Sequence, residues 1–316
     1  MEVGRLSVRT VLLNRMYING EWVKAESNEF FPVMNPANSQ QIGSVPLGGK
    51  ADAKLAVDAA YSAFKKWAAK TAEERSHLLR RWHDAILDNK TEIAETLVLE
   101  QGKPMREALG EIASAASYIA WYAEEAKRIY GETVPSSAPN KRILVLKQPV
   151  GVAALITPWN FPASMIVRKA APALASGCTV VVKPAEETPL TALKLAEAAE
   201  LAGIPAGVFN VVTGNPEEIG NAWLEDPRVR KISFTGSTEV GKMLMRKASS
   251  QVKKISLELG GHAPFIICKD ADIEEAVQGV IASKFRNTGQ TCICANRVYV
   301  EAPIAEEFTK LLAAET

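Results

Sequence analysis

The sequence has few of the residues that bind metals. It contains only four cysteines and three histidines, and neither set shows the paired spacing of zinc ligands. We therefore expect no metal site. The residues concerned are Cys178, Cys268, Cys292 and Cys294, and His77, His83 and His262.

Long hydrophobic runs are also missing. Every apolar run is far shorter than the roughly 20 residues of a membrane-spanning helix. Met1–Leu13 contains arginines but no continuous apolar stretch, so it does not resemble a signal peptide. Because neither a membrane span nor an export signal is expected, a reducing, cytoplasmic setting is the default prediction.

Neither sign of charge is in excess. The chain has 37 lysines and arginines against 36 aspartates and glutamates, which gives a formal net charge of +1. There is no basic stripe interleaved with aromatic residues. Nucleic acid and anionic membrane surfaces are therefore not expected as partners.

What the chain does contain is enough apolar residues, 47% of 316, to bury a large core. An Asn-Gly pair inside Tyr17–Trp22 predicts a small hairpin. From Asp52 onward apolar residues recur at helical spacing, Thr91 is a candidate helix cap, and Pro104 can open a further helix. Residues 1–130 are thus predicted to be a mainly helical part of a cofactor-binding domain, followed over 131–147 by an extended segment that is a candidate oligomerisation strand.

Beyond residue 147 the pattern changes to strands that alternate with amphipathic helices. Short, wholly apolar strands of this kind indicate a parallel sheet covered on both faces, and hence an α/β, doubly wound, Rossmann-like domain over residues 148–258. The predicted strands are Val150–Ile156, Thr179–Val182, Val208–Val212, Lys231–Phe234 and Lys253–Leu257, and the predicted helices are Ala163–Leu174, Leu190–Ala202, Glu217–Trp223 and Glu239–Lys247.

A second α/β unit begins after Gly260-Gly261. It contains a strand, a helix, a cysteine-bearing loop, another strand and the start of a helix, which we interpret as the beginning of a catalytic domain over 259–316. These segments are Pro264–Cys268, Asp272–Lys284, Lys284–Cys294, Arg297–Val300 and a helix that begins near Ile304.

Polar residues follow four of the predicted strands. In an open parallel sheet ligands bind at the carboxyl ends of the strands, so residues that follow different strands can meet there. Taken singly, Asn160 is better explained as a turn residue, Lys183 as a solvated strand end and Glu258 as a surface carboxylate. Together the segments predict one binding edge. The segments are Thr157–Pro162, Lys183–Glu186, Thr235–Ser237 and Glu258–Gly261.

Two of these segments suggest a dinucleotide. The Gly236–Gly241 stretch opens a helix directly after a strand and can aim unpaired N–H groups at a pyrophosphate, although a tight strand-to-helix turn explains the glycines equally well. Glu186 can accept hydrogen bonds from both hydroxyls of an adenine ribose and would repel a 2′-phosphate. The sequence therefore favours NAD over NADP.

The loop that contains Cys292 sets a thiol in a short polar turn. An isolated cysteine there is more often a small packed residue than a nucleophile. Cys178 and Cys268 lie in apolar runs and are predicted to belong to the core.

Five of these motifs resemble the aldehyde dehydrogenase superfamily in their order and approximate spacing. The match extends over nearly the whole chain from about Tyr17. The motifs are Trp159-Asn160-Phe161-Pro162, Lys183-Pro184-Ala185-Glu186, Phe234-Thr235-Gly236-Ser237, Leu257-Glu258-Leu259-Gly260-Gly261 and Gly289-Gln290-Thr291-Cys292.

The resemblance implies an oxidoreductase with defined residue roles. Cys292 would attack the aldehyde to form a thiohemiacetal, with the oxyanion held by the Asn160 side chain and the Cys292 backbone N–H. Glu258 would activate the water that hydrolyses the later thioester. The cofactor-binding residues would be Lys183 and Glu186 at the adenosine ribose, Gly236 and Ser237 at the pyrophosphate, Trp159 along the cleft, and Thr157 and Leu259.

Within that superfamily the chain is most similar to the succinate-semialdehyde and glutarate-semialdehyde dehydrogenases. Arg168 and Arg286 stand where those enzymes bind the far carboxylate of the substrate, and guanidinium groups suit that task; a surface arginine and a loop salt bridge are the simpler readings. The expected reaction is the NAD-dependent oxidation of succinate semialdehyde by a homodimer or homotetramer. Cys294 is a candidate redox partner of Cys292, the alternative being a packed small residue.

The resemblance also implies that a large C-terminal part of the family's catalytic domain lies beyond Thr316. Two hypotheses follow. Either the chain represents an incomplete semialdehyde dehydrogenase, or it is a short, inactive protein that binds cofactor or another subunit. A general aldehyde dehydrogenase of other specificity is a further alternative.

Overall fold

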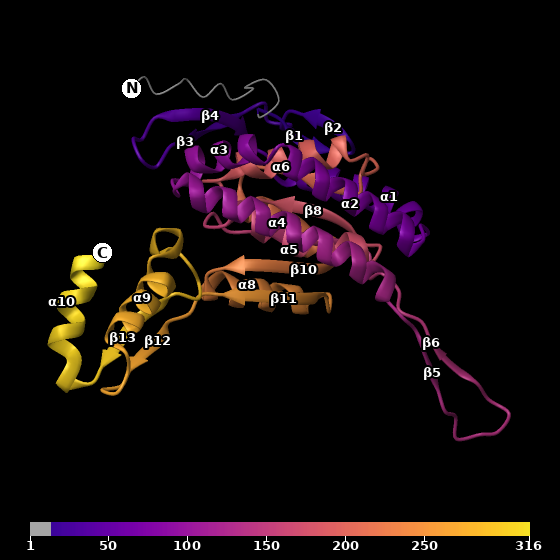
Figure 1. The fold of residues 1–316 in the computed structure, drawn as a ribbon. Coiled ribbons are helices and arrows are strands. Elements are labelled where there is room, and N and C mark those ends of the chain that lie inside the picture. The colour runs from indigo at the N-terminus through magenta and orange to yellow at the C-terminus, as the bar shows by residue number, and fades with distance from the viewer. Residues whose placement is uncertain (1–13) are drawn as a thin grey trace. The chain divides into compact units, whose positions relative to one another are not determined.

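The computed structural model describes residues 14–316, which divide into two compact units (Figure 1). The first unit contains residues 14–235 and 239–257, and the second contains residues 236–238 and 258–316. The prediction for Met1–Leu13 lies outside the described residues. In residues 14–316 no helix combines the length and the apolar character needed to cross a bilayer.

The described chain begins with two hairpins. The first, β1 (Met16–Ile18) and β2 (Glu21–Val23), confirms the predicted hairpin, with Asn19 and Gly20 both at positive φ in its turn. The second, β3 (Phe30–Met34) and β4 (Gln41–Pro46), was not predicted, because β3 is mostly exposed and carries a proline, so it lacks an apolar alternation. The first 130 residues are thus less uniformly helical than expected.

Four long helices follow these hairpins. They are α1 (Lys50–Ala68), α2 (Ala72–Asp88), α3 (Lys90–Gln101) and α4 (Met105–Glu125), the last continued by the 3₁₀ turn η1 (Ala126–Arg128). The prediction that Thr91 caps a helix is wrong. Asn89 alone separates α2 from α3, so Thr91 lies inside the first turn of α3. Thr71 instead caps α2: its hydroxyl accepts from Glu74 N, and the Glu74 carboxylate accepts from Thr71 N.

The parallel sheet of the first unit is the element that carries most of the predicted cofactor residues. Its order is β11-β10-β7-β8-β9-β1-β2, with β7 to β10 parallel and β1 and β2 as antiparallel additions at one edge. The strand order reverses at β7, which is where an open sheet of this type binds its ligand. The parallel strands and the last strand are β7 (Val152–Ile156), β8 (Thr179–Lys183), β9 (Phe209–Val211), β10 (Val229–Gly236) and β11 (Lys254–Leu259).

Helices cover this sheet on both faces. Right-handed crossovers place α5 and α6 on one face and α7 on the other. An outer layer formed by α2, α3 and α4 packs on α5 and α6, while α1 packs on α7 and the sheet. The crossover helices are α5 (Pro162–Ala175), α6 (Pro189–Leu201), α7 (Pro216–Glu225) and α8 (Thr238–Ser249).

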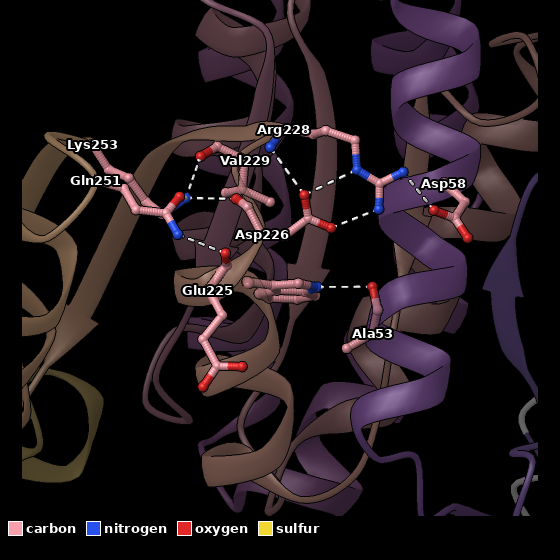
Figure 2. Close-up of polar contacts among 9 residues, drawn as sticks. Ala53, Asp58, Glu225, Asp226, Arg228, Val229, Gln251 and Lys253 are labelled. Atoms are coloured by element: carbon pink, nitrogen blue, oxygen red, sulfur yellow. Dashed lines mark hydrogen bonds and ion pairs between the residues drawn. The ribbon is translucent and has the colours of Figure 1, made fainter.

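A polar network fixes the turn that leads into β10 (Figure 2). Arg228 pairs with Asp226 and reaches Asp58 on α1, with 2.6 Å between Arg228 Nη1 and Asp58 Oδ1. The Lys253 ammonium donates to the carbonyls of Asp226 and Val229, at 2.6 and 2.7 Å. Because these contacts join α1, β10 and the start of β11, they hold the strand that ends at Thr235 and Gly236.

A two-stranded ribbon follows η1 within the first unit. It consists of β5 (Glu132–Val134) paired antiparallel with β6 (Ile143–Val145), and it forms a sheet of its own (Figure 1). The extended segment predicted over residues 131–147 contains both strands. Leu144 and Leu146 are more than 70% exposed.

The second unit has a small core of its own. Its strands β12 (Ala263–Ile267) and β13 (Ala295–Val300) are parallel, and Ile267, Val277, Val280 and Phe308 are buried between them and the helices. The prediction that Cys268 belongs to the core is wrong: it follows β12 at an exposed turn. The helical segments are α9 (Ile273–Lys284), η2 (Arg286–Gly289), η3 (Ala302–Ile304) and α10 (Ala305–Glu315).

Candidate active site

The predicted site residues are divided between the two units. Thr157, Trp159, Asn160, Arg168, Lys183 and Glu186 belong to the first unit, whereas Gly236, Ser237, Glu258, Leu259, Arg286, Cys292 and Cys294 belong to the second. Each group is described within its own unit.

Strand register brings Thr157 and Lys183 of the first group to one edge of the parallel sheet. Ile156 on β7 lies opposite Lys183 on β8 and opposite Phe234 on β10. Thr157, which follows β7, and Thr235, near the end of β10, therefore lie at the same edge of the sheet. Thr157 N donates to the Lys183 carbonyl at 3.2 Å, which joins the two strand ends.

Lys183 and Glu186 form a polar pair at the end of β8. The Lys183 side chain is 3% exposed, and its ammonium contacts the Glu186 carboxylate and donates to the Pro184 carbonyl at 2.9 Å. Burial lowers the pKa of Lys183, and the Glu186 carboxylate opposes that change. The pair thus presents a cation and a carboxylate together, which suits the hydroxyls of a ribose.

Thr157 adds an unused donor at the same edge. Among residues 14–316 its Oγ1 is one of the few buried side-chain polar atoms with no hydrogen-bond partner, and the residue is only 4% exposed. Trp159, two residues on, is 39% exposed and offers an aromatic face. An orphaned hydroxyl, an exposed indole and the Lys183–Glu186 pair are groups that a nucleotide cofactor can engage.

Asn160 lies in the turn between β7 and α5, and two residues that the sequence did not single out hold that turn. The Lys103 ammonium donates to the Asn160 carbonyl at 2.9 Å and lies 4.3 Å from the centroid of the Phe161 ring. It also pairs with Glu111 on α4. One signal could have found Glu111: it is a charged residue within the apolar stripe of α4, four residues before the buried Ala115.

Arg168 is exposed on α5, and the ring of Tyr118 on α4 supports it. The guanidinium carbon lies 5.4 Å from the ring centroid, within the range of a cation–π contact. The next residue, Lys169, is buried and donates to the Thr235 hydroxyl at 2.5 Å. Neither Tyr118 nor Lys169 was predicted.

The cysteine loop of the second unit has an unusual backbone. After α9 three successive residues take positive φ: Asn287 at 54°, Thr288 at 55° and Gly289 at 77°. A β-branched threonine rarely adopts this conformation, and such strain is concentrated at functional sites. Asn287 is 1% exposed, and its side-chain amide donates to the Gln290 carbonyl at 3.2 Å, which braces the turn.

The two thiols of this loop have opposite environments. Cys292 is exposed and Cys294 is buried, and both are free. Cys294 Sγ lies 3.2 Å from the Thr291 carbonyl and 3.8 Å from the Lys284 ammonium. Although burial raises the pKa of the Cys294 thiol, hydrogen bonds with Thr291 and the charge of Lys284 lower it overall.

Residues after β11 pack beside the cysteine loop within the second unit. A side chain at Gly261 would come within 3.5 Å of the Cys292 carbonyl, and the Asn296 amide donates to the Gly261 carbonyl at 3.4 Å. Glu258 is exposed and Leu259 is half-buried at the end of β11. Ser237 and Arg286 are exposed, and Gly236 is half-buried.

Comparison with known proteins gives a consistent result. The aldehyde dehydrogenase family matches residues 22–316. The succinate-semialdehyde dehydrogenase GabD of Escherichia coli, which is named as an NADP(+) enzyme, is 53% identical over 308 residues, covering 98% of this chain and 64% of that protein. The glutarate-semialdehyde dehydrogenase of Pseudomonas putida is 55% identical over 298 residues, covering 94% of this chain and 62% of that protein.

A solved structure agrees in fold. The crystal structure of succinate-semialdehyde dehydrogenase from Burkholderia pseudomallei matches with a TM-score of 0.96 at 52% identity, covering 99% of this chain and 65% of that one. The chain spans just under two thirds of the length of the curated relatives it matches. The predicted resemblance and the α/β fold are both confirmed, and the chain belongs to the aldehyde dehydrogenase family.

Proposed function

We propose that the protein oxidises a carboxylate-bearing semialdehyde, most simply succinate semialdehyde, to the dicarboxylic acid with NAD. The observation that carries this proposal is the exposed Cys292 thiol, in a loop with three successive residues at positive φ, in a chain of the aldehyde dehydrogenase family. The relatives named for succinate and glutarate semialdehydes support the substrate class.

Cys292 is the nucleophile in this proposal. Its thiolate attacks the aldehyde carbon, and the resulting oxyanion accepts hydrogen bonds from the Asn160 amide and the Cys292 backbone N–H. Lys183 and Glu186 would hold NAD, which would supply the hydride acceptor, and loss of hydride from the thiohemiacetal carbon would leave an acyl thioester on Cys292. Glu258 removes a proton from the attacking water, and hydrolysis releases the acid and the thiol.

Two arginines are proposed to bind the far carboxylate of the substrate. Arg168 and Arg286 are both exposed, and a guanidinium can bind a carboxylate through two parallel hydrogen bonds. The Tyr118 ring beside Arg168 limits the freedom of that side chain.

NAD rather than NADP is proposed because Glu186 stands at the end of β8 beside Lys183. A carboxylate there accepts ribose hydroxyls and repels a 2′-phosphate. The E. coli relative is named for NADP(+), so the preference must be measured. We expect Glu186→Ser to lower the NAD-over-NADP ratio of kcat/KM by at least about tenfold, and an unchanged ratio would contradict the cofactor assignment.

The β5–β6 ribbon is proposed to mediate assembly into a homodimer or homotetramer. A two-stranded hairpin is marginal by itself in water, and this one exposes Leu144 and Leu146. The cytoplasmic setting is likewise kept as a proposal, since exposed free thiols at Cys268 and Cys292 suit a reducing compartment.

The substrate assignment is tested by comparing charged and uncharged aldehydes, using the protein at the full length that its host produces. We expect Arg286→Ala to reduce kcat/KM for succinate semialdehyde by about 10- to 100-fold, because a charge-assisted pair contributes about 1.5–3 kcal/mol. Butanal, which lacks the carboxylate, should lose much less. Arg246→Ala on α8 is the matched control for the loss of one exposed positive charge. Equal losses for the two aldehydes would overturn the anchor.

A further inference from the structure

A buried ion pair lies behind the turn that carries Asn160. Lys103, from the loop between α3 and α4, is 1% exposed, and Glu111, on the first half of α4, is 5% exposed. Their charged groups are 2.5 Å apart. Neither residue follows a strand of the sheet, so neither is among the residues that a strand-end search identifies.

The lysine binds the Asn160 end of the turn. Its ammonium donates to the Asn160 carbonyl at 2.9 Å, and the same group faces the ring of Phe161 at 4.3 Å. A compact cation with three donors is thereby shared between a carboxylate, a backbone carbonyl and an aromatic face. The peptide group between Asn160 and Phe161 is consequently held in one orientation.

The glutamate binds the other end of the turn. Its Oε1 accepts from the backbone N–H groups of Ala163 and Ser164, at 3.0 and 3.1 Å, in the first turn of α5. These are N–H groups that have no partner within the helix. Burial raises the pKa of Glu111, and the Lys103 ammonium and both backbone donors oppose that rise. One ion pair therefore clamps both ends of residues 160–164.

Such a clamp matters because oxyanion stabilisation depends on donors that are held in place before the reaction. Removing one donor of this kind reduces kcat by about 100- to 1,000-fold, and a displacement of about 1 Å can reduce the rate by about 100-fold. Since the Asn160 backbone is fixed by Lys103, the base from which its side-chain amide extends is fixed as well.

We propose that Lys103 and Glu111 are positioning residues for catalysis, which hold the Asn160 turn in the geometry that its amide needs to stabilise the oxyanion. The inference rests on the proposed function, in which Asn160 is the oxyanion donor. It assigns a rate effect to two residues that touch neither the substrate nor the cofactor.

The test uses the full-length protein and removes both charges together, because a single substitution would leave one buried charge without its partner. Lys103→Met/Glu111→Gln keeps the side-chain lengths and one capping oxygen but loses the donor to the Asn160 carbonyl. Glu100→Gln is the matched control, since the Glu100 carboxylate caps α6 through Leu190 N and Thr191 N rather than α5. Single-turnover hydride transfer, the Kd for NADH and the rate of Cys292 alkylation by iodoacetamide are measured for each variant.

We expect the double variant to slow hydride transfer by about 10- to 100-fold. The Kd for NADH and the alkylation rate should stay within about twofold, because neither requires the oxyanion site, and Glu100→Gln should leave hydride transfer within about threefold. In an Asn160→Ala background the same double substitution should slow hydride transfer by less than about threefold, because residues that act through one group are not additive.

Other outcomes separate the two proposals. If Asn160→Ala slows hydride transfer and Lys103→Met/Glu111→Gln does not, the positioning role is overturned and the oxyanion role stands. A parallel fall in hydride transfer, NADH binding and alkylation would identify general loosening and overturn positioning. If Asn160→Ala has no effect, the oxyanion role fails and the positioning role fails with it.

Discussion

Helices α5 and α6 are both held at their N-termini by a buried glutamate from an outer helix, but the two attachments differ in charge. Glu111 on α4 caps α5 with Lys103 beside it. Glu100 on α3 caps α6 through Leu190 N and Thr191 N, and within residues 14–316 it forms no ion pair. Burial, the largest influence, raises the pKa of Glu100 to about 8 despite its backbone donors.

Each pair of helices has a second contact about one turn further along the sheet helix. On α6 the buried Lys194 pairs with Glu92 of α3, at 2.6 Å, and with Glu197. On α5 the exposed Arg168 lies over the Tyr118 ring of α4. Each outer helix therefore uses one N-terminal cap and one later contact to hold its sheet helix.

The difference indicates which of the two attachments needs a permanent charge. A protonated Glu100 still accepts a backbone N–H, so the α6 cap needs only an oxygen. At the α5 cap the Lys103 ammonium pairs with Glu111 and also donates to the Asn160 carbonyl, so this cation contacts the turn of the proposed oxyanion site. We infer that α6 is held mainly for packing, and α5 for the geometry of the turn before it.

The largest expected effect on stability comes from removing the cation at the α5 cap, which leaves a buried glutamate without an ion-pair partner, as at the α6 cap. Lys103→Met leaves Glu111 buried without its cation and should lower the free energy of unfolding by about 3–5 kcal/mol. The loss should grow between pH 5.5 and 8.5. Without the lysine the folded-state pKa of Glu111 rises, so folded protein holds a proton that the unfolded chain releases, and stability falls as pH rises.

Urea unfolding of the full-length protein at the two pH values measures this loss. Adding Glu111→Gln to Lys103→Met should recover part of the stability, because the uncompensated carboxylate is gone. A loss below about 1 kcal/mol, or one that shrinks with rising pH, would mean that the pair does not carry the charge assigned to it.

The second prediction concerns Glu100. Its replacement by glutamine removes the pH dependence that this carboxyl group adds to the stability. Because its folded-state pKa is raised, the contribution of Glu100 to stability is fully present below the unfolded value of 4.5 and is lost as pH rises through about 8. Glu100→Gln does not titrate and leaves one backbone N–H facing an amide nitrogen, so it should be less stable than wild type by about 1–2 kcal/mol at pH 5. At pH 9 the two proteins should converge or reverse in order, and a gap that stays constant between these values would refute the raised pKa.

These buried contacts mark the limit of what the sequence could predict. The β7, β8 and β10 strands were predictable because each is a short apolar run followed by a polar segment, and in the first unit Thr157 and Lys183 do leave one edge of the sheet. The Lys103–Glu111 pair was not predictable from sequence spacing, because it joins a loop to a helix. Its lysine also binds the backbone carbonyl of Asn160, which is 57 residues away from Lys103.

The cysteine loop shows a different limit. Its position as a short polar turn between a helix and a strand was predicted. The positive φ of Thr288 could not be anticipated, because threonine disfavours that conformation and only the surrounding contacts impose it. For Cys268 the sequence context was misleading: it predicted a buried residue, but the apolar run ends at an exposed turn.

The third prediction tests whether the Lys194 ion pairs on α6 stabilise the protein as much as the fully buried Lys103–Glu111 pair does. Lys194 is 4% exposed, but its partners Glu92 and Glu197 are 44% and 26% exposed. Lys194→Met therefore leaves two carboxylates that water can solvate, and we expect a loss of about 1 kcal/mol or less. A loss that approaches that of Lys103→Met would show that Glu92 is desolvated in the folded protein.

The smallest expected effect comes from removing the contact between Arg168 on α5 and the Tyr118 ring on α4. It concerns substrate binding rather than stability. Tyr118→Leu removes the ring beneath Arg168, a contact that contributes about 0.5–1 kcal/mol at an exposed site. The guanidinium then samples more orientations, so KM for succinate semialdehyde should rise about two- to fivefold while KM for butanal stays constant. Tyr118→Phe keeps the ring and should match wild type with both aldehydes. If Tyr118→Phe raised KM as much as Tyr118→Leu, the hydroxyl rather than the ring would be responsible, and α4 would not support Arg168 in the way that it supports Asn160.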